Sequence, residues 1–263
     1  MTWAPQLEAV ARIASSEERI AQYTRLLEHA LHDTPSASLP SLVRTYVDGA
    51  VLDPVNTTGA GLLVGRHMLA HLATQLAAAH IPANILCTIV SDTLATCEAS
   101  SIMGDDELGP WRVLLAEQYA SLSRWRDAAQ ALQSITPHAA RRIPQLSFAQ
   151  LCVRVVELWL HDLPSHVAEA EQAIKRANSA ILDERDNKAL VHELWSYHAR
   201  VLAIQHRFME AAARYMDLPH ADMYTAVYAI ISPPSAQRTS MLTRLAQQAS
   251  AWPFAQTLRH AAE

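Results

Sequence analysis

The fold is decided by the stretch Phe208-Met209-Glu210-Ala211-Ala212-Ala213-Arg214-Tyr215, in which an aromatic residue, two small residues and a second aromatic residue recur one helical turn apart. This spacing places all four on one side of a helix. Because the small residues let a neighbouring backbone approach, that side can pack closely against another helix. The stretch therefore predicts one half of a tightly packed helical hairpin.

The same pattern occurs earlier in the chain. The residues Trp125, Ala128, Ala129, Leu132 and Ile135 have the spacing that Phe208, Ala211, Ala212, Tyr215 and Leu218 have later, and Val167, Ala170 and Ile174 form a fainter copy between them. The copies begin 42 and 41 residues apart. A period in this range is typical of stacked helical hairpins. We therefore expect an all-α solenoid with Trp125 and Phe208 buried at equivalent positions.

The composition argues against several classes of protein. Half of the 263 residues are hydrophobic and 18% are charged, which argues against disorder. The longest apolar runs, such as residues 226–231, are far shorter than the roughly 18 residues of a membrane span, so no membrane association is expected. The first residues lack a basic region followed by an apolar core, which predicts a location inside the cell. The three cysteines, Cys87, Cys97 and Cys152, form no close pair and are expected to be buried thiols.

Charge is unevenly distributed. Residues 1–109 carry 5 basic and 12 acidic side chains, whereas residues 110–263 carry 16 basic and 14 acidic ones. Neither part has the excess of basic residues that binding to a nucleic-acid phosphate backbone requires, so a protein partner is favoured over nucleic acid. All six glycines lie in the first part, and the second part therefore lacks the residue that tight β-turns prefer.

Apolar residues at helical spacing, separated by helix-breaking residues, predict helices throughout the sequence. The expected ranges are 5–14, 16–32, 42–52, 61–80, 83–101, 111–122, 125–135, 148–159, 164–181, 191–202, 208–216, 222–231, 235–248 and 254–262. Residues 103–110 have the composition of a linker. Three parts are expected: N-terminal helical repeats over 1–109, helical hairpins over 110–218 and a further helical region over 219–263. Packing between repeats is assigned to Trp125, Ala128, Ala129, Leu132, Trp159, Ala170, Ile174, Trp195, Leu202, Phe208, Ala211, Ala212 and Tyr215.

Residues that could carry chemistry have a plainer explanation in each case. His67 and His71 stand four apart on an expected helix, but no glutamate follows His67 as in zinc proteases and no third ligand is evident. His198 lies on an apolar stripe, where a histidine is more often part of the core than an acid or base. The run Asp105–Glu107 reads as a solvated segment, with contact to a partner as the second interpretation.

Other active-site motifs are missing as well. The glycines at 59, 61 and 65 follow no strand and lack the lysine of a phosphate loop. No nucleophile elbow occurs. We therefore expect no catalytic residue, no metal and no cofactor.

Several motifs resemble, in the same order, those of the COP9 signalosome subunit 4 family. They are residues 125–130, Ala199-Arg200-Val201-Leu202, residues 208–212 with Arg214-Tyr215, and Gln237-Arg238 with Met241-Leu242. Weaker similarity includes Ala170-Glu171, Ile174 and Arg176-Ala177, and it extends to Tyr23 and Leu27 near the start. The similarity covers nearly the whole chain and is strongest over 111–245.

The resemblance implies a right-handed superhelical arm of TPR-like hairpins that leads into the helical start of a PCI domain. The family works in a complex that removes the ubiquitin-like modifier Nedd8 from cullin–RING ubiquitin ligases, in the cytoplasm and nucleus. This subunit would be a scaffold that contacts other signalosome subunits and the ligase, while a different, zinc-dependent subunit cleaves the isopeptide bond. The family continues into a winged helix and a helical tail, which this sequence lacks, so the PCI domain is expected to be truncated.

Two alternatives remain open from the sequence. A scaffold subunit of the proteasome lid or of another PCI complex would show the same hairpins. A metal-dependent enzyme would need ligands that the sequence does not reveal. The first alternative differs from the signalosome in the complex that co-purifies with the chain, and the second in metal content and turnover.

Overall fold

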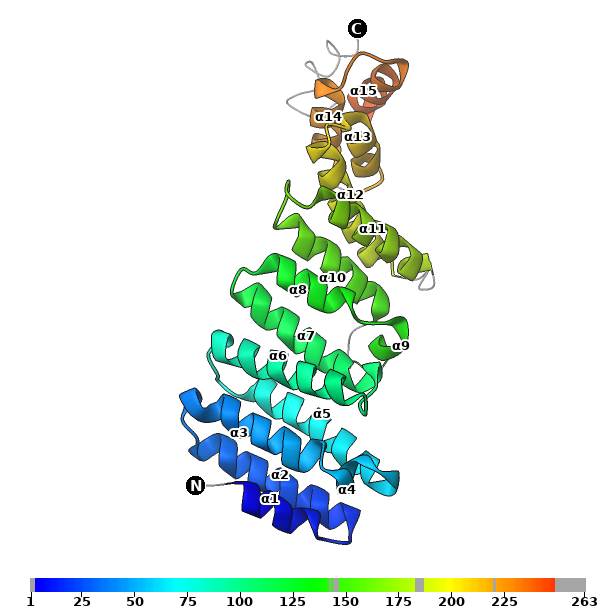
Figure 1. The fold of residues 1–263 in the computed structure, drawn as a ribbon. Coiled ribbons are helices and arrows are strands. Elements are labelled where there is room, and N and C mark those ends of the chain that lie inside the picture. The colour runs from blue at the N-terminus through cyan, green and yellow to red at the C-terminus, as the bar shows by residue number, and fades with distance from the viewer. Residues whose placement is uncertain (1–2, 142, 144–146, 183–186, 220, 249–263) are drawn as a thin grey trace. The chain divides into compact units, whose positions relative to one another are not determined.

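Helices make up the regular structure of this chain in a computed structural model, which describes residues 3–141, 143, 147–182, 187–219 and 221–248 (Figure 1). No strand occurs among the described residues. The chain divides into two compact units, Met1–Phe148 and Ala149–Glu263. The expected all-α class with packed helical hairpins is confirmed. The helix expected over 254–262 lies outside the described residues.

The first unit runs from α1 to α9. Its α-helices are α1 (Ala4–Ala11), α2 (Ser16–Asp33), α3 (Leu39–Tyr46), α4 (Pro54–Thr57), α5 (Leu62–Ala78), α6 (Ala83–Ser100), α7 (Asp105–Ser121), α8 (Trp125–Gln133) and α9 (Pro137–Ala140). Short 3₁₀ turns cover Ser36–Ser38 and Gly59–Gly61, and a π-helical turn over Val47–Val51 continues α3.

A continuous cluster of buried apolar residues in this unit extends from α1 to α7. Helix α2 shows how the sequence builds it: Tyr23, Leu27 and Ala30 recur at intervals of four and three and are all buried. This interval aligns them along the side of α2 that faces the other helices. On α7, Trp111 is fully buried in the same cluster.

A buried polar network lies inside this core and links α2 to α4. Arg19 is 5% exposed and donates to Asn56 Oδ1 at 2.9 Å. The Asn56 amide in turn donates to the Ala50 carbonyl oxygen at 2.9 Å and to the Tyr23 hydroxyl at 3.2 Å. Because a buried polar group without a partner is costly, these bonds fix how α4 sits on α2.

Residues 103–110 differ from the expected linker, because α7 begins among them. The Glu107 carboxylate accepts the backbone N–H of Gly104 at 2.9 Å, which satisfies a donor just before the helix. The acidic residues Asp105 and Asp106 occupy its first turn, where negative charge favours the helix dipole. The cluster of glycine and acidic residues thus marks a helix start.

The second unit contains α10 (Phe148–Leu160), α11 (Val167–Leu182), α12 (Lys188–Ile204), α13 (Phe208–Met216), α14 (Asp222–Ile231) and α15 (Ala236–Gln248). From α11 onward each helix packs against the next one in sequence. This nearest-neighbour packing is what a helical repeat requires.

Candidate interaction surfaces

The turn between α7 and α8 is closed by local contacts. Ser123 has a positive φ of 58°, and the backbone N–H of Arg124 donates to the Tyr119 carbonyl oxygen at 2.8 Å. The Arg124 side chain then pairs with Asp127 in the first turn of α8 at 2.7 Å. Its guanidinium carbon also lies 4.4 Å from the centroid of the Tyr119 ring. The turn therefore fixes where Trp125 begins α8.

The turn between α12 and α13 repeats this arrangement. His206 has a φ of 61°, and the N–H of Arg207 donates to the Leu202 carbonyl oxygen at 2.9 Å. Arg207 donates two hydrogen bonds to the Glu210 carboxylate, at 2.7 and 2.6 Å. This bidentate contact holds the pKa of Glu210 below its ordinary value. Phe208 begins α13 as Trp125 begins α8.

The fainter copy has a similar contact between a basic and an acidic residue but a different turn. His166 Nδ1 lies 3.4 Å from Glu169, and the His166 carbonyl oxygen accepts the Ala170 N–H. The preceding turn contains a cis Leu163–Pro164 peptide bond. A basic residue before the helix and an acid two residues into it thus recur in all three copies. The repeat was predicted from its aromatic and small residues alone, and this pair was missed although its spacing is visible in the sequence.

The residues assigned to repeat packing fall into two groups. Those that are buried are Ala128, Ala129, Leu132, Trp159, Ala170, Ile174, Leu202, Ala211, Ala212 and Tyr215, and those that are half-buried are Trp125, Trp195 and Phe208. The expectation that Trp125 and Phe208 are buried was therefore wrong. Each is the first residue of its helix, beside the turn, where solvent reaches part of the ring. The paired alanines one turn later are fully enclosed.

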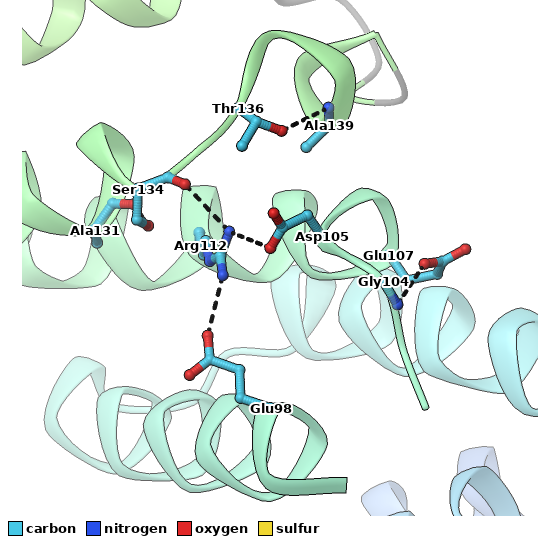
Figure 2. Close-up of polar contacts among 9 residues, drawn as sticks. All are labelled: Glu98, Gly104, Asp105, Glu107, Arg112, Ala131, Ser134, Thr136 and Ala139. Atoms are coloured by element: carbon cyan, nitrogen blue, oxygen red, sulfur yellow. Dashed lines mark hydrogen bonds and ion pairs between the residues drawn. The ribbon is translucent and has the colours of Figure 1, made fainter. Parts of the chain in front are cut away.

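Some of the acidic side chains of residues 1–109 are neutralised within the first unit. Figure 2 shows Arg112 of α7 between Glu98 of α6, at 3.1 Å, and Asp105, at 3.2 Å. Arg112 also donates to the Ser134 carbonyl oxygen, just after α8, at 3.3 Å. One guanidinium group thus ties three consecutive helices together.

Two further acids of this part face basic groups. Glu107 lies 3.2 Å from Arg66, and Asp106 lies 3.2 Å from His138. Arg66 is already counted in residues 1–109, but Arg112 is not, so the contacts of Arg112 with Glu98 and Asp105 make the charge available to a partner smaller than the sum over 1–109 indicates. Acidic residues that remain exposed there include Glu8, Glu17, Glu18, Glu28, Asp48 and Asp92.

An apolar stripe lies on the surface of α14 in the second unit. Met223 and Tyr224 are each 58% exposed, Val227 is 49% exposed and Ile231 is 51% exposed. Met223, Val227 and Ile231 are spaced four residues apart and so share one side of the helix. Tyr224 stacks on Tyr215 of α13, with ring centroids 5.2 Å apart. Exposed apolar side chains gathered in this way are typical of protein contact surfaces.

The groups considered for chemistry are not assembled into a site in the described part of the chain. His67 is exposed and His71 is half-buried on α5. Among the described residues no group of three or more histidine, cysteine, aspartate or glutamate side chains is placed to hold a metal ion. His198 is half-buried, and its pKa is lowered by burial and by the nearby Arg214 and Arg207.

The thiols are enclosed, as expected. Burial raises the pKa of Cys97 and of Cys152 to about 11, and it raises the pKa of Cys87 as well. A thiol with a raised pKa stays protonated at neutral pH and is a poor nucleophile. Separately, the helices of the described segments are all too short or too polar to span a lipid bilayer.

Comparison with known proteins gives a consistent set of relatives. No protein-family model matches the chain. It is 29% identical over 258 residues to COP9 signalosome complex subunit 4 of Caenorhabditis elegans, covering 90% of this chain and 61% of that protein. It is 25% identical over 210 residues to the Arabidopsis thaliana subunit 4, covering 80% and 49% of the two chains. The Drosophila melanogaster subunit 4 is also 25% identical over 210 residues, covering 78% and 48%. This chain therefore spans about half to three fifths of the length of these relatives.

Proposed function

We propose that the protein is a non-catalytic scaffold subunit of a COP9 signalosome, because its sequence is similar to subunit 4 of that complex. The observation that carries the proposal is the extent of the similarity, which covers 90% of the chain. The helical hairpins support it, because stacked helices offer long surfaces for several protein partners. The buried thiols fit a structural role.

The complex would deneddylate cullin–RING ubiquitin ligases, in the cytoplasm and nucleus, with cleavage carried out by another subunit. Helices α11–α15 would lead into a PCI domain that contacts other signalosome subunits. The first unit would serve as an arm that holds the ligase. Its exposed acids, among them Glu28 and Asp92, support docking to a basic surface, since complementary charge mainly raises the association rate.

The first experiment identifies the complex. The tagged full-length chain is purified from its own cells, and the co-purifying proteins are identified by mass spectrometry. We expect signalosome subunits in stoichiometric amounts. Recovery of proteasome-lid subunits instead would replace the proposal by its main alternative, and recovery of neither set would refute both.

The second experiment tests the arm. Deleting residues 1–109 would cut into α7 and expose the core around Trp111, so charge variants of the full chain are preferable. Glu28→Gln with Asp92→Asn removes two exposed charges from the first unit. Glu193→Gln with Asp217→Asn, which also replaces exposed acids, is the matched control in the second unit.

Association with a purified cullin–RING ligase is then measured at ionic strengths of about 0.1 and 1 M, where the Debye length falls from about 10 to about 3 Å. We expect the first variant to associate more slowly and to lose part of its salt dependence, and the control to behave as the wild type. Equal effects of the two variants would refute docking through the first unit.

A further inference from the structure

A groove opens on the first unit between the start of α1, the connector after α2 and the start of α3. Its volume is about 490 Å³, which is within the range of ligand pockets. The lining residues are Trp3, Ala4, Asp33, Thr34, Pro35, Ser38, Ser41, Leu42 and Thr45. Helices α1, α2 and α3 contact one another (Figure 1), so the walls belong to one packed body.

Four hydroxyl groups line the groove, and those of Ser38, Ser41 and Thr45 present hydrogen-bond acceptors because their protons are already engaged. Ser41 donates its proton to the Ser38 carbonyl oxygen at 2.8 Å, and Thr45 donates to the Ser41 carbonyl oxygen at 2.9 Å. Ser38 donates to the Pro35 carbonyl oxygen at 3.2 Å. Since a hydroxyl has one proton, the oxygen of each of these three side chains keeps lone pairs but has no donor left for a ligand.

Asp33 adds a negative charge to this set. One carboxylate oxygen lies 2.7 Å from His29 Nδ1 and the other lies 3.0 Å from His32 Nδ1. The hydrogen bond from His32 is the main reason that the pKa of Asp33 is lowered, so the group is ionised at neutral pH. The carboxylate is half-exposed, and two contacts leave it free to accept further hydrogen bonds.

Trp3 supplies an aromatic wall beside the carboxylate. Its ring meets the His29 ring edge to face, with centroids 6.1 Å apart, and His29 in turn contacts Asp33. The indole is half-buried against the core, and it also lines the groove. Electron-rich aromatic faces attract cations, and they attract the flat guanidinium group in particular.

We propose that this groove binds an arginine side chain from a basic segment of a protein partner. A guanidinium group has five N–H donors and no acceptor, which complements a groove whose hydroxyl oxygens and carboxylate all accept. Its planar shape allows it to lie on Trp3 while its N–H groups reach Asp33. An anion would be repelled by Asp33, and an apolar side chain would leave the acceptors without partners. The identity of the partner as a cullin–RING ligase rests on the proposed function, whereas the chemistry of the groove does not.

The test uses a peptide, so that its failure is separate from failure of the proposed complex. The probe is a short acetylated and amidated peptide with one central arginine among glycines and serines. A second peptide carries citrulline, which has nearly the same shape but no charge. Binding to the full ¹⁵N-labelled chain is followed by NMR at the tryptophan indole N–H signals, and the signal of Trp3 is assigned with Trp3→Phe.

We expect the arginine peptide to shift the Trp3 signal in a saturable way. Its affinity should fall by about tenfold or more with citrulline or with Asp33→Asn, as lost hydrogen bonds to a charged group predict. Asp217→Asn is the control, since it removes an exposed acid that lies outside the groove, and it should change the affinity by less than about twofold.

Three results would overturn the proposal. The first is no shift at Trp3 up to about 10 mM arginine peptide. The second is equal binding of the citrulline peptide. The third is equal weakening by Asp33→Asn and Asp217→Asn, which would show that the peptide senses only the overall charge of the chain.

Discussion

Removing the two acidic partners of Arg112 together should destabilise the first unit by more than the sum of the separate removals. Arg112 is 12% exposed, whereas Glu98 is 50% exposed and Asp105 is 52% exposed. The carboxylates can therefore return to water when the arginine is lost. The guanidinium group cannot do so without disrupting α7.

The magnitudes follow from this asymmetry. Glu98→Gln or Asp105→Asn alone leaves Arg112 with one carboxylate, and each should cost about 0.5–1 kcal/mol. The double variant leaves a mostly enclosed charge with neutral acceptors only, the two amide oxygens and the Ser134 carbonyl oxygen, and it should cost about 2–4 kcal/mol, below the full penalty of a completely buried charge because some solvent reaches it. Arg112→Met, which keeps most of the apolar stem, should cost about 1–2 kcal/mol.

Native-state hydrogen exchange measured on peptides from α7 and α8 is the suitable assay, with peptides from α14 as an internal reference. A single denaturation midpoint would be ambiguous, since two compact units need not unfold together. Repeating the acid substitutions in the Arg112→Met background separates the ion pairs from the effect of Asp105 on the helix dipole.

Additive costs of the two acid substitutions would refute this prediction. If the double variant costs the sum of the single variants within about 0.3–0.5 kcal/mol, the two carboxylates do not share one arginine in an energetic sense. The prediction would also be contradicted if Arg112→Met cost more than the double acid variant. The destabilisation would then not come from an enclosed guanidinium group that has lost its carboxylate partners.

Three further outcomes are expected. Hydrogen exchange of peptides from α10 and α8 should show that Trp159→Ala costs about 3–5 kcal/mol and that Trp125→Ala, which removes a half-buried side chain, costs only about 1–2 kcal/mol, and equal costs would contradict this difference in burial. Ser123→Gly should stabilise the α7–α8 hairpin by about 0.5–1 kcal/mol, because glycine accepts a positive φ, whereas Ser123→Ala should give no gain in exchange protection. Folding lowers the pKa of His198, so the folded protein favours the neutral imidazole. This preference contributes fully to the free energy of unfolding above the unfolded-state pKa of about 6.5, and the contribution is lost as the pH falls from there through the folded-state pKa. His198→Gln should therefore lose less stability than the wild type between pH 7.5 and pH 5, and parallel pH profiles would show that His198 is not responsible.

Periodicity predicted the helices of the second unit well, because each of them owes its place to local spacing. Helix α13 occupies the expected residues 208–216, and α14 occupies the expected 222–231. In the first unit, helix α8 likewise begins at Trp125 as predicted, although it ends two residues early at Gln133. In these segments the apolar residues keep a single helical spacing, and residues that favour turns stand at the helix ends. Local sequence preference and tertiary packing therefore favour the same structure.

The first unit was predicted less completely, for two physical reasons. Its short helices, such as Pro54–Thr57 and Pro137–Ala140, are too brief to show a period and are set by capping and packing. Its polar network depends on the contact between Arg19 and Asn56, which are 37 residues apart. Spacing along the chain carries no sign of such a pair. The groove beside Trp3 escaped prediction for the same reason, since α1, α2 and α3 must meet before it exists.

The hairpin turns before Trp125 and Phe208 also bear on how the chain acquires its structure. The bonds that close them join residues only three to five positions apart, such as Arg124 to Tyr119 and Arg207 to Glu210. Contacts this local form with little loss of loop entropy. Each turn can therefore close as soon as its own helices have left the ribosome, before later repeats are synthesised. Synthesis itself would then deliver the hairpins one after another, each already closed, in their order along the sequence.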